Sequence, residues 1–185
     1  MDAGIPNCYG CFAPFPGFQI WLVHRLQSVG LVSGIMHSTY GWLTCEILHF
    51  FGLSVLLGTI GMFDLRVLGV AKRIPISALH RVAPWGIVGF FINTITGLMF
   101  LVTYPNLYVY QPPFIAKMMF MTLAAINALI FNLVVLRRVD ALAPGEDAPL
   151  TAKIMCGASL CLWVGVIFAG RLLAFYKPLW GGPPP

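Results

Sequence analysis

Residues 42–70 read WLTCEILHFFGLSVLLGTIGMFDLRVLGV, and this stretch decides the fold. Its middle, residues 47–63, is apolar apart from His49, Ser54 and Thr59. A bilayer core of about 30 Å needs roughly 20 apolar residues in a helix, and this stretch supplies them. We therefore predict a membrane-spanning helix, whose ionisable side chains need protein partners or water around them.

The whole chain has the composition of a membrane protein. Of its 185 residues 59% are hydrophobic and 9% are charged, and the mean hydropathy is +0.86; a soluble domain carries about 25% charged residues. The net charge of +5 comes from residues spread among apolar segments. It therefore indicates topology and attraction to anionic lipid, and we expect contact with the bilayer and no nucleic-acid partner.

Three further apolar runs follow the first, at residues 82–104, 114–136 and 152–176. Pro84 is predicted in the first turn of the second run, where a missing amide costs little. Short polar or proline-containing turns join the runs, which favours helices that alternate in direction. The predicted fold class is all-α: an integral membrane four-helix up-down bundle with an N-terminal interfacial helix.

The chain divides into three predicted regions. Residues 1–41 hold an irregular arm rich in proline and glycine and then an amphipathic helix at residues 18–33, which lies in the interface or forms a tilted extra span. Residues 42–176 form the four-span bundle, and residues 177–185 are a tail rich in proline and glycine. Cys8 and Cys11, in the arm, are expected to form a disulfide or to stay as two free thiols.

Lysine and arginine predict the orientation of the bundle, because loops on the cytoplasmic side carry an excess of them. One side of the membrane holds the larger set: Arg66, Lys72, Arg73, Arg81, Arg137, Arg138 and Lys153. The other side holds the smaller set: Arg25, Lys117, Arg171 and Lys177. We therefore expect the larger set to be cytoplasmic and both termini to lie on the outer side of the membrane.

Polar residues of three predicted spans meet at one depth near the outer side of the membrane. Glu46 and His49 lie three residues apart on one helical face, and up-down threading brings Lys117 and Arg171 to the same level. One interpretation is a structural cluster in which Glu46 pairs with a cation. The other is a site for a quinone headgroup, a haem or a metal, with His49 as ligand or hydrogen-bond donor and Glu46 as its orienter. At the cytoplasmic end, Asp64 and the nearby arginines are expected to form an Asp–Arg pair.

Geometry limits the choice of cofactor. His80 is expected roughly 25 Å from His49 along the membrane normal, too far to share one iron, so a haem on His49 needs His24, His37 or a non-histidine ligand. A di-iron centre needs the Glu-x-x-His pair twice, and the chain has it once. A single copper or zinc on His49, Glu46 and an outer histidine remains an alternative.

Three segments of the spans are EILHFFGLSVLLGTIGMFDLRVLG (46–69), PPFIAKMMFMTLAAINALIFN (112–132) and LWVGVIFAGRLLAFY (162–176). They resemble a family of bacterial four-helix inner-membrane proteins to which no activity is assigned. The resemblance implies a four-helix bundle in a bacterial inner membrane, where the outer side with both termini would be the periplasmic side. Family members often end the third helix with a histidine where this chain has Asn132, which weakens a cytoplasmic haem built on His80. The similarity to four-helix cytochrome b and copper-resistance membrane proteins is one of architecture only.

The function expected from the sequence is that of a subunit or partner in a bacterial membrane redox system. It would bind a quinone headgroup or a b-type haem through His49, Glu46, Lys117 and Arg171, with His49 as the metal ligand in the haem case. The alternative is a cofactor-free accessory subunit that packs against a larger membrane complex. The sequence contains no Ser-His-Asp set, phosphate-binding glycine loop or pair of catalytic carboxylates, which disfavours an autonomous hydrolase or transferase.

Overall fold

The computed structural model describes residues 16–27, 30–70, 72–143 and 145–175, and the regular structure within these ranges is helical throughout. The short elements are α1 (Pro16–Gln27), α2 (Gly30–Met36) and α5 (Pro105–Val109). The long ones are α3 (Thr39–Leu68), α4 (Ile76–Thr103), a third span made of α6 (Pro112–Ile130), η1 (Phe131–Val135) and α7 (Leu136–Asp140), and α8 (Leu150–Phe175). In the described part, four helical segments are long and apolar enough to cross a membrane, which confirms the predicted fold class.

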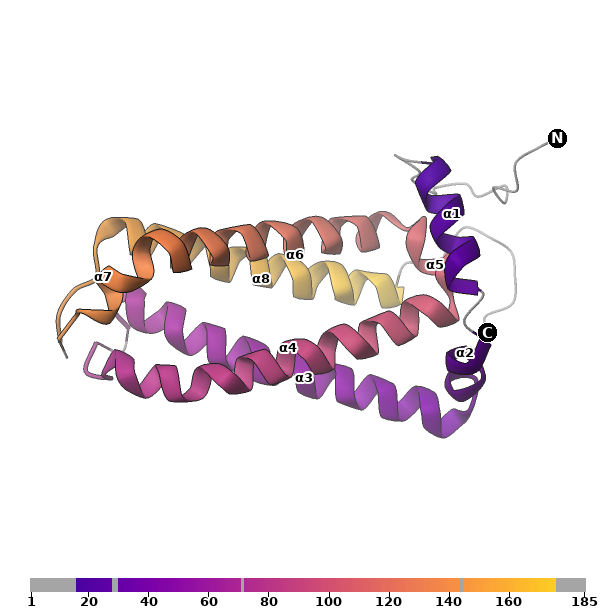
Figure 1. Cartoon of the computed structure of the whole chain (residues 1–185), viewed down its shortest axis with the longest axis horizontal. Helices are drawn as coiled ribbons and strands as arrows, with labels where there is room; N and C mark the ends of the chain where they lie inside the picture. Colours follow the sequence, from indigo (N-terminus) through magenta and orange to yellow (C-terminus); the bar gives the residue numbers. More distant parts are fainter. Residues whose placement is uncertain (1–15, 28–29, 71, 144, 176–185) are drawn as a thin grey trace.

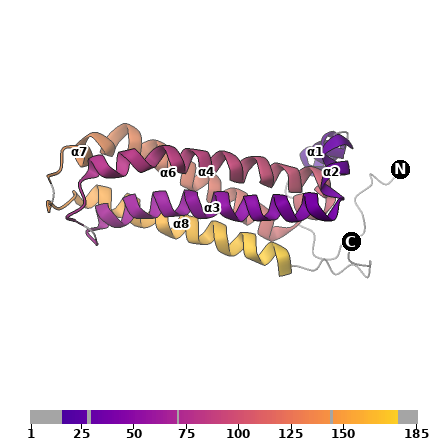
Figure 2. The ribbon, with the colours of Figure 1, turned by 90° about the horizontal axis from the view of Figure 1, so that it is seen from below.

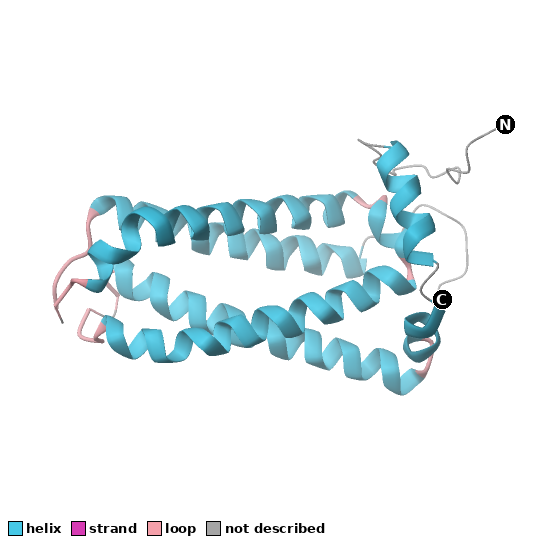
Figure 3. Cartoon of the chain, in the orientation of Figure 1, coloured by secondary structure: helices cyan, strands magenta, loops and turns pink. Residues whose placement is uncertain are grey.

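The four spans lie side by side and alternate in direction (Figure 1). The start of α3 and the end of α8 lie at the same end of the bundle, together with α1, α2 and α5; we call this the open end. The turns between α3 and α4 and between α7 and α8 lie at the opposite end, which we call the loop end (Figure 3). The chain therefore enters and leaves the bundle on one side of the membrane.

Local signals set the two ends of α3. The Ser38 hydroxyl accepts a hydrogen bond from the Gly41 amide (3.0 Å), which caps the first turn and starts the helix before residue 42. Gly69 ends it with a φ of 103°, and its amide donates to the carbonyls of Leu65 and Arg66. This left-handed conformation suits glycine, so the helix stops where the span leaves the apolar layer.

The second span differs from its prediction. Helix α4 begins at Ile76, directly after Pro75, so Pro84 lies inside the helix and not in its first turn. The polar residues before position 82 continue the helix beyond the apolar run, a feature that a search for hydrophobicity alone overlooks. Because Pro84 has no amide hydrogen, it cannot complete the helical hydrogen bond to the carbonyl of His80.

The third span also extends past its apolar run, to Asp140, and it contains one widened turn. In η1 the Leu136 amide donates to the carbonyl of Phe131, five residues earlier, which is the π-helical pattern. Phe131 and Val135 at the two ends of this turn are both buried.

The spans pack as two close pairs, α3 with α4 and α6 with α8, which meet through α3 and α8 (Figure 2). The main apolar cluster joins the pairs toward the loop end; it consists of Val67, Ile76, Leu79, Phe131, Val135, Val139, Ala148, Ala152 and Cys156. Within the first pair, backbones approach closely where Gly52 faces Gly89. Small residues at such crossings let helices associate in lipid by van der Waals packing.

The predicted interfacial helix is divided into α1 and α2. Val23 of α1 is buried against Val109 and Tyr110, and the Gln19 amide donates to the carbonyl of Val109 (3.0 Å). The segment is therefore anchored on α5 at the open end. The arm with Cys8 and Cys11 and the tail at 177–185 lie outside the described residues.

Candidate functional site

His49 lies half-buried on α3 at the contact with α4. Its Nδ1 is 2.9 Å from the hydroxyl of Thr96, a buried residue of α4. The Thr96 hydroxyl lies 2.7 Å from the carbonyl of Ile92, to which it donates its proton, and with this assignment Nδ1 is the donor to Thr96. In this tautomer neutral His49 carries its proton on Nδ1, next to Thr96 and the backbone of Asn93, and presents a lone pair at Nε2.

Two further contacts hold His49 and its helix in place. The Asn93 amide donates across the helix pair to the backbone carbonyl of His49 (3.0 Å). The imidazole also packs edge-on against Phe100, with ring centroids 5.6 Å apart. Because both partners belong to α4, the orientation of the imidazole depends on the packing of the first helix pair.

Lys117 is the cation that the structure brings toward His49. It is half-buried in the first turns of α6, and its positive charge acts on the His49 imidazole. The side chain crosses α8 at Gly170, where an added Cβ would lie 3.9 Å from Nζ. Within the described ranges Lys117 has neither a hydrogen bond nor an ion pair, so its charge is available to a ligand.

Glu46 faces a different group. Its side chain is exposed, and its charge acts on Tyr108 of α5. Burial, together with the neighbouring Tyr104 and the charges of Glu46 and Cys45, raises the pKa of Tyr108 to about 12. The part of the chain that the structure describes contains no ion pair between Glu46 and a cation.

Arg171 also points away from the predicted cluster. It is exposed on α8, and its guanidinium carbon lies over the ring of Phe175, 5.0 Å from the centroid. This cation–π contact at the helix end gives the charge a local partner. The four predicted residues therefore act on different groups: the charge of Lys117 acts on His49, and the charge of Glu46 acts on Tyr108. Arg171 lies over Phe175 of its own helix.

His37 and His80 each contact a residue other than His49. His37 packs on Tyr104 (5.7 Å between centroids), which packs on Trp42 (5.8 Å), which packs on Phe100 (4.9 Å). These rings lie between His37 and His49. His80, at the loop end, bonds Asp140 (2.8 Å). The described residues also contain no cluster of three His, Cys, Asp or Glu side chains suited to a metal ion.

Thr96 is the residue of this site that sequence analysis missed. Its signal is its position three residues after Asn93, on the same face of the second span. Thr96 also lines a hollow of about 310 Å³ between α2, α3 and α4, whose other lining residues are Ile35, Tyr40, Gly41, Thr44, Cys45, Leu48 and Met99. His49 itself does not line this hollow.

The predicted Asp–Arg pair at the loop end is wrong. Buried Asp64 lies beside the side chains of Ser159 and Cys156 on α8, and its Oδ2 has no hydrogen-bond partner among the described residues. The Nε of Arg66, by contrast, donates to the carbonyl of Ile74 (2.7 Å). Residues 64 and 66 point about 200° apart around α3. The acid therefore faces the second helix pair, and the arginine faces the turn that follows α3.

Comparison of the chain with models of known protein families, with curated proteins and with solved structures gives no match.

Proposed function

We propose that this chain is a subunit or partner of a bacterial membrane redox system and that it binds a quinol headgroup at His49 and Lys117. The observation that carries the proposal is the pairing of His49 Nδ1 with Thr96. This bond leaves Nε2 as an acceptor inside a membrane-spanning segment. A quinol hydroxyl would donate to Nε2, and the Lys117 ammonium would stabilise negative charge that develops on the quinol oxygen.

A quinol suits these residues better than a b-type haem does. His49 could ligate iron through Nε2, with Thr96 holding the other nitrogen, as second-shell partners of metal-bound histidines do. His37 packs on Tyr104 and His80 bonds Asp140, so neither is placed beside His49 as a second axial ligand. A quinol needs one acceptor and one nearby cation, and His49 and Lys117 meet both needs.

The competing proposal is a cofactor-free accessory subunit that packs against a larger membrane complex. It is supported by the low burial of the spans: only 17–22% of the residues in their most apolar windows are buried. Lipid and protein partners can both cover such apolar surfaces.

We further propose that the open end faces the periplasm of a bacterial inner membrane. The support is the excess of lysine and arginine at the loop end, which is typical of the cytoplasmic side. An alkaline phosphatase fusion at the C-terminus would then be active, and an inactive fusion that is well expressed would contradict this orientation.

Binding of a short-chain benzoquinol to the purified full chain in detergent tests the proposed site. We expect the variant His49→Leu to raise the Kd about tenfold, because it removes one hydrogen bond to a buried acceptor, worth about 1.4 kcal/mol. Lys117→Met should also raise the Kd for benzoquinol when His49 is unchanged. His80→Leu, at the loop end, is the matched control and should leave the Kd unchanged.

A visible absorption spectrum of the protein purified from its native membranes separates the remaining proposals. A Soret band that is present in the unmodified protein and lost in His49→Leu would favour the haem proposal over the quinol proposal. A colourless protein that yields no extractable quinone and binds no benzoquinol would leave the accessory subunit as the better proposal.

A further inference from the structure

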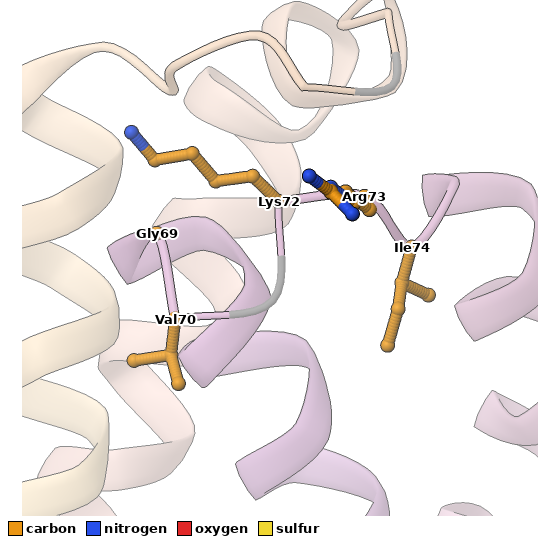
Figure 4. A pocket seen from close by; sticks show the side chains of 5 residues that line it. All are labelled: Gly69, Val70, Lys72, Arg73 and Ile74. Atoms are coloured by element: carbon orange, nitrogen blue, oxygen red, sulfur yellow. The ribbon is translucent and has the colours of Figure 1, made fainter.

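The turn between α3 and α4 encloses a hollow at the loop end (Figure 4). Its volume is about 430 Å³, and it is lined by Gly69, Val70, Lys72, Arg73 and Ile74. The turn follows directly on the last residue of a candidate span, Leu68. It therefore lies at the level where lipid headgroups meet a membrane protein.

A buried arginine lies under this turn. Arg66 is 1% exposed, and its Nε donates to the carbonyl of Ile74, one of the residues that line the hollow. Its Nη1 and Nη2 groups are buried and have no partner within the described part of the chain. A guanidinium in an apolar environment is costly unless a counter-charge lies nearby.

The acids near the turn do not supply that counter-charge. Asp64 lies beside side chains of α8 and forms no ion pair with Arg66, and Asp147 is bonded by both Lys72 (2.8 Å) and Lys153 (2.9 Å). Arg73 is exposed, and no acid of the described residues pairs with it. The positive charges of Arg66 and Arg73 therefore have no acidic partner among the described residues.

The dipoles of the two helix ends beside the turn do not decide whether a negatively or a positively charged ligand is favoured. The C-terminal end of α3 disfavours an anion and the N-terminal end of α4 favours one, and the two dipoles act on the same turn. The side chains therefore decide. An anion in the hollow would contact Arg73, because Lys72 is already bonded to Asp147. It would also be attracted by Arg66, which bonds the carbonyl of Ile74 in a medium of low dielectric constant.

We propose that the turn formed by Gly69, Val70, Lys72, Arg73 and Ile74 is a phosphate-binding site that takes the headgroup of an anionic phospholipid. Arg73 binds the phosphate oxygens, and buried Arg66 supplies the attraction that makes this turn more selective than a scatter of surface cations. The site lies at the opposite end of the bundle from His49 and does not depend on the proposed quinol site.

Spin-labelled lipids test the proposal on the full chain in phosphatidylcholine vesicles. We expect labelled phosphatidylglycerol to associate with the protein more strongly than labelled phosphatidylcholine. The variant Arg73→Gln should lower this preference about fivefold, the effect of one cation near an anionic surface. The matched control Arg171→Gln, at the open end, should keep it.

Arg66 needs a separate pair of variants because it is buried. Arg66→Lys keeps the charge and should keep the preference, and Arg66→Gln should lower it about fivefold. The helical circular dichroism spectrum establishes that each variant is folded. No preference for phosphatidylglycerol in the unmodified protein, or an equal loss in Arg73→Gln and Arg171→Gln, would overturn the site.

Sodium phosphate, compared with sodium chloride at equal ionic strength, identifies the source of the phosphate group. A preference for phosphatidylglycerol that withstands sodium phosphate supports a lipid headgroup as the occupant. Specific displacement of the lipid by phosphate supports the same anion site but overturns the lipid as its preferred occupant.

Discussion

Replacing Gly89 with alanine tests how closely α3 and α4 approach each other. An alanine Cβ at this position would lie 2.7 Å from the carbonyl oxygen of Gly52, 2.8 Å from the amide nitrogen of Leu56 and 3.2 Å from the Cβ of Val55. Two of these three atoms belong to the backbone of α3, so no side-chain rotation relieves the contact. The helices must move apart.

The expected cost follows from this geometry. Overpacking of a tight contact costs typically 1–3 kcal/mol, and a gap of 0.5–1 Å along the helix pair forfeits a quarter to a half of each dispersion contact. The higher helix propensity of alanine returns up to about 1 kcal/mol. We therefore expect Gly89→Ala to lower the free energy of unfolding by about 1–2 kcal/mol.

Gly58 on α3 provides the control, because an added Cβ there meets no atom within 4 Å among those described. Gly58→Ala should leave the free energy of unfolding unchanged or raise it by up to about 1 kcal/mol. Titration of the purified protein in mixed micelles with sodium dodecyl sulfate, followed by circular dichroism, measures both values. Equal stability of the two variants would refute the close approach of the backbones.

Three further predictions concern polar contacts. Hydrogen bonds from two lysines lower the pKa of Asp147 from 3.8 to about 2. The difference in unfolding free energy between the unmodified protein and Asp147→Asn should therefore be constant above about pH 4 and vanish as the pH falls through about 2. Unfolding measured over this range of acidic pH checks the prediction. Thr96→Val removes the partner of His49 Nδ1 and should lower the stability by about 1 kcal/mol and weaken benzoquinol binding, with both measured on the same preparation. Asn127→Ala breaks a bond to the carbonyl of Met155 on α8 and should cost about 1 kcal/mol in the same micelle titration, whereas Asn132→Ala, whose bond stays within its own helix, should cost less.

Apolar length predicted the four spans, because a bilayer imposes the same length on every helix that crosses it. The helix ends were less predictable, since hydropathy does not register polar turns that continue a helix. Ser77 and Arg81 lie in α4 although they precede the apolar run, and this placed Pro84 wrongly. Ser38, which caps α3, is a signal that the sequence does contain.

Depth along a helix was easier to predict from the sequence than direction around it. Glu46 and His49 are at the expected level, yet they face Tyr108 and Thr96 respectively. Which face of α3 meets α4 depends on the approach of Gly52 to Gly89, a contact between distant segments that spacing within one helix does not reveal. For the same reason the sequence did not identify Thr96 as the partner of His49.

The widened turn η1 determines the effect of deleting one residue from the third span. A π-helical turn takes in an extra residue, so the side chains that follow it are rotated by about 100° relative to an unbroken α-helix. Deleting one residue within Phe131–Val135 should convert this turn into regular α-helix. The depth of Arg137 and Arg138 relative to the membrane should then change little. The π-helical turn therefore sets the rotation of the second half of the span about its axis relative to the first half. Because of this rotation, both Ala124 in the first half and Val139 in the second half are buried against the rest of the bundle.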